Sequence, residues 1–211
     1  MAYLVKTPWW LSRLFYCDLN WKIQQDAKPS VYLTFDDGPH PTITPFVLDQ
    51  LKAHNAKATF FCIGKNVAQH TDVYKRTIAE GHTVGNHTHN HLNGWFTKTE
   101  AYLENVEQAA KLINSRLFRP PYGRIKRSQA NRLMRKKPSY KIYMWDVLSA
   151  DFDITLAPEK CLTNVLDNIE SGSIVVFHDS EKAWDRMSYA LPRVLEHCTQ
   201  QGWDIKALPQ H

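Results

Sequence analysis

The chain has 211 residues, of which 43% are hydrophobic and 22% are charged, and its formal net charge is +5. This length and composition indicate one well-packed globular domain rather than two. No stretch approaches the roughly 18 consecutive apolar residues that a membrane-spanning helix needs, so we expect no transmembrane segment. The basic residues are scattered and belong to no recognisable motif, so we expect no nucleic acid as a partner.

The first 29 residues are rich in aromatic side chains, but charged residues such as Lys6 and Arg13 interrupt the apolar run. No secretory signal is therefore visible, and this predicts a cytoplasmic protein. We expect residues 1–29 to pack against a domain formed by residues 30–211, with an amphipathic anchor at a membrane surface as the alternative. The cysteines are too sparse for a disulfide scaffold, and we expect reduced thiols, mostly in the core: Cys17, Cys62, Cys161 and Cys198.

Strand patterns and helix patterns alternate along the rest of the chain. The predicted strands are Ser30–Phe35, Ala58–Ile63, Thr83–Asn86, Leu117–Arg119, Lys141–Val147, Ser173–His178 and Trp203–Leu208. Helical patterns cover Lys65–Glu80, Arg127–Lys136, Pro158–Ile169 and Ala190–Gln201, and two more begin at Thr44 and Thr97. Strands that alternate with helices indicate a parallel sheet wrapped by helices. About seven such units favour a barrel or near-barrel, with an open doubly wound sheet as the structural alternative.

The two remaining helices carry sequence signals at their starts. Thr44 precedes Pro45, which is typical of an N-cap followed by proline at the first helical position. Thr97 is followed three residues later by Glu100, the spacing of a capping box. We therefore expect helices to begin at these two threonines.

Polar residues of catalytic type follow five of the predicted strands. In parallel α/β folds the carboxyl ends of the strands share one face, and ligands bind there. The sequence therefore predicts that five polar clusters meet on one rim: Asp36-Asp37, His87 to His91, Arg119 to Gly123, Asp146 to Asp151, and His178-Asp179.

Two of these clusters predict a metal site. Adjacent carboxylates such as Asp36 and Asp37 cannot both be buried and ionised without a cation nearby, although an Asp pair also suits a simple turn. His87 and His91 have the spacing to face one ion, and His82 and His89 are further candidates of lower rank. Two imidazoles and one carboxylate suit zinc, with iron, cobalt or nickel as alternatives.

Two other clusters predict groups that act on a substrate. The Arg119-Pro120-Pro121-Tyr122-Gly123 stretch is a rigid turn that can present a backbone N–H to an oxyanion, although it also suits a structural loop. His178 ends an apolar strand and is a candidate general acid, with Asp151 as the carboxylate that orients it.

Taken together, these motifs make the chain resemble the polysaccharide deacetylases of carbohydrate esterase family 4, which share the NodB homology domain. The resemblance covers about residues 30 to 208. It rests on four motifs that occur in order: Thr34 to Pro39, His87 to His91, Arg119 to Gly123, and Val176 to His178. The resemblance implies a distorted (β/α) barrel of about seven parallel strands and a metal-dependent hydrolase.

The resemblance also implies a role for each matching residue. Asp37, His87 and His91 would bind the metal, while Asp36 would be the general base and Arg119 would orient it. The backbone N–H of Tyr122 would bind the oxyanion, and His178 would be the general acid with Asp151 as its partner. The substrate pocket would include Phe152, Pro121 and Val176.

The sequence departs from the family pattern in its fourth motif. Phe152 follows Asp151 where the family usually has tryptophan, and Leu148 stands where another aspartate is common. We expect an acetylated carbohydrate as the substrate, with N-acetyl groups on an amino-sugar polymer or oligosaccharide as the target. A hydrolase of O-acetyl esters or of another amide, and a carbohydrate-binding protein without activity, remain as alternatives. The oligomeric state stays open.

Overall fold

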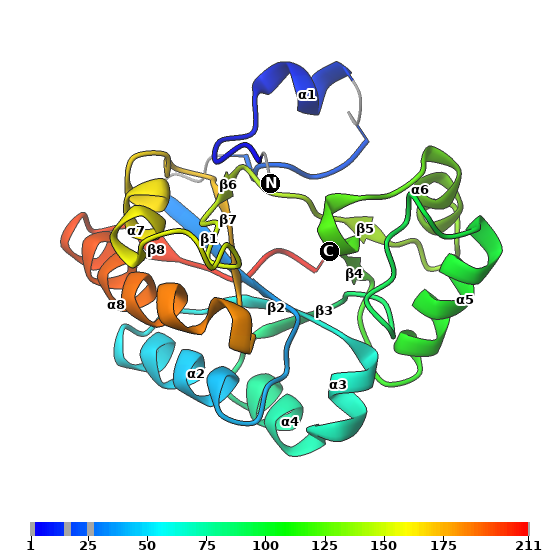
Figure 1. Ribbon diagram of the computed structural model, residues 1–211, viewed down its shortest axis with the longest axis horizontal. Helices are drawn as coiled ribbons and strands as arrows, with labels where there is room; N and C mark the ends of the chain where they lie inside the picture. Colours follow the sequence, from blue (N-terminus) through cyan, green and yellow to red (C-terminus); the bar gives the residue numbers. More distant parts are fainter. Residues whose placement is uncertain (1–2, 15–17, 25–27, 211) are drawn as a thin grey trace.

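The computed structural model describes residues 3–14, 18–24 and 28–210. Its centre is a curled parallel sheet of eight strands in which seven follow the order β5-β4-β3-β2-β1-β7-β6 and β8 pairs with β1 (Figure 1). The strands are β1 (Ser30–Asp36), β2 (Thr59–Cys62), β3 (Thr83–Asn86), β4 (Leu117–Phe118), β5 (Lys141–Ile142), β6 (Val147–Leu148), β7 (Ile174–His178) and β8 (Asp204–Ile205). The prediction of a distorted barrel with about seven parallel strands is confirmed.

Helices cover the outside of this sheet and a short one lies apart from them (Figure 1). The α-helices are α1 (Trp9–Leu14), α2 (Ile43–Ala53), α3 (Gly64–Gln69), α4 (Thr71–Ala79), α5 (Thr99–Ala110), α6 (Arg127–Met134), α7 (Pro158–Leu166) and α8 (Trp184–Gln200). Two 3₁₀ turns, η1 (Pro121–Gly123) and η2 (Glu181–Ala183), follow the ends of β4 and β7. The loops that follow β4 and β7 therefore contain short 3₁₀ turns rather than leading directly into α-helices.

The alternation of side chains along β1 separates the outer core from the barrel interior. Val31, Leu33 and Phe35 belong to the large apolar core formed with the outer helices. Successive side chains of a strand point to opposite faces, so Thr34 and Asp36 point into the barrel. The strand thus delivers a carboxylate to the interior while its other face is held by packing.

The prediction of a single strand over Lys141–Val147 is wrong, and the barrel has an opening at this stretch of the chain. Residues 141–142 pair with β4 and residues 147–148 pair with β7, at opposite ends of the strand order. The backbone between them leaves both ladders, and Arg119 binds the carbonyl oxygens of Tyr143 and Met144 in that stretch. The hydrogen bonds from the Arg119 guanidinium to these two carbonyl oxygens thus compete with strand pairing at these residues.

The described N-terminal residues lie along this opening. The N–H of Leu148 donates to the Val5 carbonyl at 2.8 Å, and the N–H of Thr7 donates to the Asp146 carbonyl at 2.9 Å. Further along, the Asn20 N–H donates to the Ile142 carbonyl at 2.9 Å. Residues 5–7 and 20 therefore take up backbone groups that a closed sheet would have paired.

Three helix predictions need correction. The segment Lys65–Glu80 is two helices, α3 and α4, because the chain leaves helical conformation at His70. Thr44 does not cap α2, since its hydroxyl donates to Asp179, and the N–H of Ile43 donates to His40 Nδ1 instead. The capping box is also absent: the Thr97 hydroxyl donates to the Asn93 carbonyl at 2.7 Å, and α5 begins two residues later.

The cysteines in the described residues are free and buried: Cys62, Cys161 and Cys198. Cys17 lies outside the described residues. Burial raises the pKa of the Cys198 thiol to about 11, as expected for an unreactive core thiol. No helix in the described part of the chain has the length and apolar character needed to cross a bilayer.

Candidate active site

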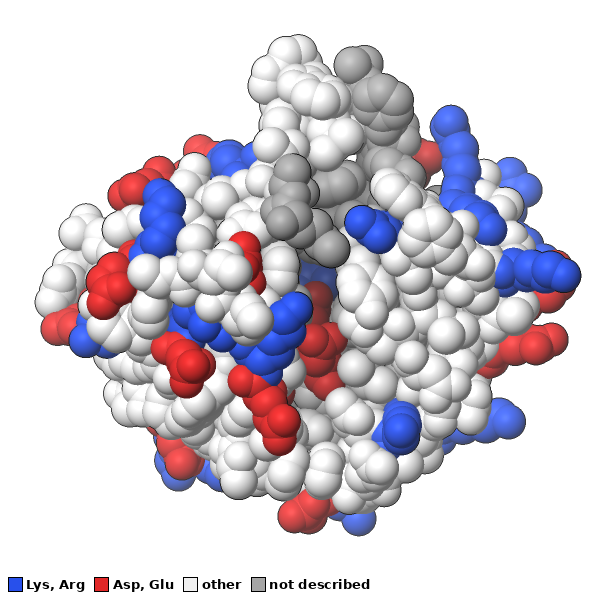
Figure 2. All heavy atoms as spheres, in the orientation of Figure 1, with Lys and Arg blue, Asp and Glu red and all other residues white. Residues whose placement is uncertain are grey.

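The polar clusters that follow the strands come together at the carboxyl end of the sheet. In the register of β1 and β7, Asp36 lies opposite His178, so the last residues of two neighbouring strands are side by side. Asn86 at the end of β3 is likewise opposite Phe118 at the end of β4, which places His87 near Arg119. Figure 2 shows a hollow on one face of the molecule with acidic side chains inside it and basic side chains beside it.

The predicted metal ligands lie within reach of one ion. Asp37 Oδ1 is 3.2 Å from His91 Nε2 and 3.8 Å from His87 Nε2. One donor atom from each of the three residues lies within 4.8 Å of the other two. One carboxylate oxygen and two imidazole nitrogens are typical of a catalytic site, which leaves coordination positions for water and substrate. Asp37, His87 and His91 thus form a possible metal site.

The hydrogen bonds around these ligands fit a divalent cation. Asp37 Oδ1 is buried and has no hydrogen-bond partner among the described residues, a state that a cation would relieve. His87 Nδ1 lies 2.8 Å from the Arg119 carbonyl oxygen, which can only accept, so the proton sits on Nδ1 and the lone pair on Nε2. His87 therefore presents the unprotonated nitrogen Nε2 to Asp37.

The charge states of the ligands point the same way. Burial lowers the pKa of His87 to about 4, which keeps the imidazole neutral at pH 7. Burial alone would raise the pKa of Asp37, but the neighbouring imidazoles of His91, His178 and His87 hold it well below its usual range. A neutral imidazole and an ionised carboxylate are the forms that bind metal.

The neighbouring carboxylate, Asp36, binds Arg119 inside the barrel. Arg119 Nη1 donates to Asp36 Oδ1 at 2.8 Å and to Thr34 Oγ1 at 2.6 Å. The guanidinium also donates to the carbonyl oxygens of Tyr143 and Met144. Arg119 is completely buried, so this set of acceptors replaces the water that the cation has lost.

His178 and Asp151 form a second pair on the rim, at the end of β7. His178 Nδ1 lies 2.7 Å from Asp151 Oδ1, and the His178 N–H donates to Asp151 Oδ2 at 2.7 Å. Burial alone would lower the pKa of His178, but the charge and hydrogen bond of Asp151, together with Asp37 and Asp36, raise it to about 10. The imidazole is therefore held protonated at neutral pH.

The backbone of the rim is strained. The described residues include six non-glycine residues with positive φ, and five of them lie in the loops after the strands: Asp37 (82°), Thr88 (63°), His91 (56°), Tyr122 (61°) and Ala150 (62°). Each such conformation costs about 1–3 kcal/mol and persists where the surrounding structure enforces it. Strain of this kind clusters at functional sites, and no sequence motif revealed it.

The predicted pocket residues differ in their exposure. Phe152 is half-buried, and its ring centroid lies 5.4 Å from that of His178 in an edge-to-face arrangement. Pro121 and Val176 are buried, so their place in a substrate pocket stays a prediction. The exposed ring of Tyr122 lies 4.5 Å from the His91 ring.

Two site features were missed or misplaced at the level of sequence. Asp179 is buried and accepts hydrogen bonds from the Gly38 N–H at 2.9 Å and from the Thr44 hydroxyl, which ties β7 to the turn after β1. Its position after His178 put it among the polar clusters predicted for the rim, but nothing in the sequence indicates these two hydrogen-bond partners. His82 and His89 lie outside the trio of possible ligands; His82 instead accepts the Ala58 N–H at 3.2 Å.

Comparison with known proteins matches this arrangement to one family. The sequence model described as polysaccharide deacetylase matches residues 23–137. A peptidoglycan-N-acetylglucosamine deacetylase of Bacillus cereus is 33% identical over 191 residues, covering 88% of each chain. A chitooligosaccharide deacetylase of Azorhizobium caulinodans is 35% identical over 200 residues, covering 85% of this chain and 93% of the relative.

Solved structures show the same similarity. The crystal structure of the Bc1960 peptidoglycan N-acetylglucosamine deacetylase, in complex with an N-hydroxybenzamide compound, superposes with a TM-score of 0.82 at 29% identity, covering 95% of this chain and 96% of that one. A mutant of BA3943, described as a CE4 family pseudoenzyme with restored enzymatic activity, has a TM-score of 0.73 at 25% identity, covering 89% of this chain and 68% of that one. The resemblance predicted from the motifs is confirmed: the chain belongs to the polysaccharide deacetylase family and is a hydrolase that acts on non-peptide carbon–nitrogen bonds.

Proposed function

We propose that this enzyme removes the N-acetyl group from N-acetylglucosamine residues of a peptidoglycan- or chitin-like chain and releases acetate. The observation that carries this proposal is the meeting of three groups at one rim. These are a set of possible metal ligands, a buried carboxylate held by Arg119, and an imidazole held by Asp151. The relatives that act on peptidoglycan N-acetylglucosamine and on chitooligosaccharides support the substrate class.

Asp37, His87 and His91 would hold the metal, for which zinc is the first candidate and cobalt, nickel and iron are alternatives. A divalent cation supplies, when bound, polarisation of the acetyl carbonyl and a lower pKa for a water molecule. The ring of His87 is oriented for this by its bond to the Arg119 carbonyl. Arg119 therefore orients the metal ligand His87 through its carbonyl group and binds the proposed base Asp36 through its side chain.

Asp36 would accept the proton of the attacking water. A general base must be held in a fixed position, and the Arg119 guanidinium donates to one oxygen of Asp36 at 2.8 Å. Because Arg119 also binds Thr34 and two backbone carbonyls, it fixes the direction of the carboxylate. Asp36 is thus suited to the role of base and Arg119 to that of a positioning residue.

His178 would protonate the leaving nitrogen. An amine leaves readily only in its protonated form, and His178 is held protonated by Asp151. The N–H of Tyr122, at the positive-φ residue of η1, would donate to the oxyanion of the tetrahedral intermediate. Bond cleavage then yields acetate and a free amino sugar.

The intact contacts favour catalysis over a binding protein without activity. A binder has no need to keep Arg119 on Asp36 and Asp151 on His178, and both pairs have distances under 3 Å here. An alcohol that leaves from an ester would use the same acid, so the choice of an N-acetyl substrate over an O-acetyl ester rests on the relatives.

The test is acetate release from chitooligosaccharides, peptidoglycan fragments and acetylxylan, each measured on metal-free protein and after addition of zinc, cobalt, nickel or iron. The proposal predicts metal-dependent release from at least one of the two amino-sugar substrates and little from acetylxylan. Release from acetylxylan alone would favour the ester hydrolase, and release from none of the substrates with any metal would contradict the proposal.

A further inference from the structure

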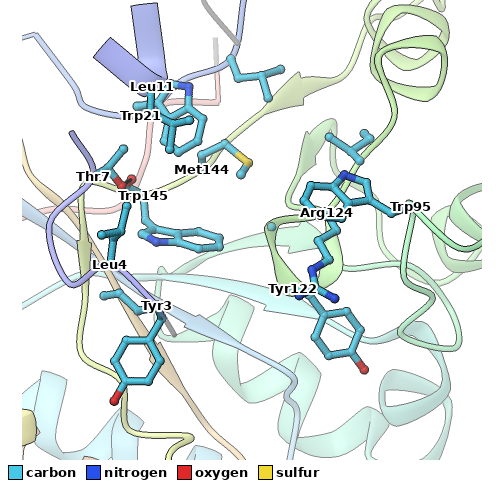
Figure 3. Close-up of a pocket in the computed structure, with 14 residues that line it drawn as sticks. Tyr3, Leu4, Thr7, Leu11, Trp21, Trp95, Tyr122, Arg124, Met144 and Trp145 are labelled. Atoms are coloured by element: carbon cyan, nitrogen blue, oxygen red, sulfur yellow. Dashed lines mark hydrogen bonds between the residues drawn. The ribbon is translucent and has the colours of Figure 1, made fainter. Parts of the chain in front are cut away.

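A cavity of about 350 Å³ adjoins the candidate active site (Figure 3). One wall comes from the N-terminal residues and the other from the loops after β3 and β4, with the Trp145 side chain between them (Figure 3). The principal side chains of the two walls are Leu4, Leu11, Trp21, Trp95, Tyr122 and Trp145. The residues of the N-terminal wall precede residues 23–137, the part of the chain that matches the family model.

The walls are held in place by backbone contacts. Val5 and Thr7 on the N-terminal side pair with Leu148 and Asp146 at the edge of β6, as described above. On the opposite side, the Gly94 N–H donates to the Arg124 carbonyl at 3.1 Å, which joins the two loops that carry Trp95 and Tyr122. The cavity is therefore a preformed feature of the fold, which is typical of small-molecule sites.

The chemistry of the lining fits hydrocarbon rather than sugar. No aspartate, glutamate, asparagine or glutamine is among the described residues that line it, and Arg124 is the one charged member. The Thr7 hydroxyl already donates to the Trp145 carbonyl at 2.8 Å, and the Tyr3 hydroxyl donates to Asp153 at 3.0 Å. A hydrocarbon chain needs no polar partner in such a lining, whereas each sugar hydroxyl buried there would need one.

The cavity is continuous with the catalytic rim. Tyr122 lines the cavity, and its ring centroid lies 4.5 Å from that of the proposed metal ligand His91. Leu148 lines the cavity three residues before Asp151, the partner of His178. A molecule whose acetyl group lies at the rim can therefore extend a second group into the cavity.

We propose that this cavity binds a hydrocarbon chain that the acetylated substrate carries beside its sugar, so that the enzyme acts on a sugar-bearing lipid. The proposal rests on the proposed N-deacetylase function for the position of the sugar. The volume of about 350 Å³ lies in the range of known ligand pockets. Burial of a chain between these aromatic and aliphatic walls is favourable for each methylene group removed from water.

The first experiment measures binding without chemistry. Methyl, butyl, hexyl and octyl β-glucosides, which carry no acetyl group, are titrated into the zinc-loaded protein by calorimetry below their micelle-forming concentrations. The gain per methylene is up to about fourfold in affinity, so we expect hexyl glucoside to bind at least about tenfold more tightly than methyl glucoside. Affinity that does not change with chain length would overturn the proposal.

The second experiment uses a matched pair of variants. Leu4 lines the cavity and is 57% exposed, whereas Ile154 is 68% exposed and does not line it. Leu4→Gln should reduce the hexyl-to-methyl affinity ratio, Leu4→Trp should reduce it by filling the space, and Ile154→Gln should leave it unchanged. An equal hexyl-to-methyl affinity ratio in the wild type and the three variants would show that the alkyl chain binds elsewhere and would overturn the assignment.

Acetate release from alkyl glycosides of N-acetylglucosamine separates this proposal from the proposed function. Here kcat/KM should rise from the methyl to the hexyl compound. Release that is independent of chain length would contradict the lipid site while the deacetylase function stands. Chain-length-dependent binding without any acetate release would support the cavity and contradict the function.

Discussion

Arg119 and Asp36 form an ion pair inside the barrel, with Nη1 of the guanidinium 2.8 Å from Oδ1 of the carboxylate and both side chains buried. The pair links the end of β4 to the end of β1. Loss of one partner from a buried pair leaves an uncompensated charge, which costs about 3–5 kcal/mol. We therefore expect loss of the contact to reduce both stability and the catalytic geometry proposed above.

Arg119→Leu should lower the free energy of unfolding by about 3–5 kcal/mol and remove activity, because Asp36 is left buried without its counter-charge. Asp36→Asn should destabilise less, since the amide oxygen can still accept from Arg119. Urea denaturation of both variants and of the double variant checks this. A loss of under about 1 kcal/mol in Arg119→Leu would show that the pair contributes little to stability.

Asp151→Asn should move the alkaline limb of kcat/KM to lower pH. Burial alone lowers the pKa of His178 and the Asp151 carboxylate raises it, so the amide removes the effect that keeps the imidazole protonated. Activity that needs protonated His178 is lost as the pH rises through its pKa, and that pKa falls in the variant. The check is kcat/KM from pH 5 to pH 10 for both proteins.

His178→Ala serves as the companion variant and should lower turnover by roughly 100-fold or more at every pH. It should still bind metal, because His178 is not among the three possible ligands. An Asp151→Asn profile that superposes on the wild-type profile would show that Asp151 does not control the protonation of His178.

Asp179 should position the turn that carries Asp37. Its carboxylate accepts from the Gly38 N–H, and any side chain at position 38 would collide with Asp179 Oδ2, so the two residues are in close contact. Asp179→Ala leaves a buried N–H without a partner and should destabilise by about 1–3 kcal/mol with lower activity. Asp179→Asn keeps an acceptor and should be milder in both measurements; equal effects would contradict the positioning role.

His82 should make stability depend on pH. Burial, with the nearby Lys57 charge, lowers its pKa to about 4, whereas an unfolded histidine titrates near about 6.5. Between these values the unfolded chain binds a proton that the folded chain does not, so the free energy of unfolding decreases as the pH falls from about 6.5 to 4. His82→Asn keeps an acceptor for the Ala58 N–H and should flatten this slope in denaturation curves; an unchanged slope would contradict the assignment.

Much of the fold could be predicted from the sequence, for identifiable reasons. The β1 residues Val31, Leu33 and Phe35 alternate with polar ones, so both the strand and its buried face are visible in the pattern. Polar residues that follow apolar strands, such as Asp36 and His178, could be placed on one rim because parallel strands end on the same side.

The errors arise where a tertiary contact overrides a local signal. Thr44 and Thr97 are good capping residues, but Asp179 and the Asn93 carbonyl take their hydroxyls. The stretch between β5 and β6 reads as strand, yet Arg119 binds its carbonyls. Neither the positive φ of Tyr122 nor the role of Asp179 has a local sequence signature, because both depend on contacts between distant segments.

Metal content measured together with acetate release in Asp36→Asn and Asp37→Asn is the sharpest test of the proposed metal site and base. Asp37 Oδ1 faces His87 and His91, whereas Asp36 Oδ1 faces Arg119, so the two adjacent carboxylates should have different roles. We expect Asp36→Asn to keep full metal occupancy and to be inactive at any metal concentration, while Asp37→Asn loses metal and is partly restored by excess zinc. Loss of metal from Asp36→Asn with retention in Asp37→Asn would contradict this expectation.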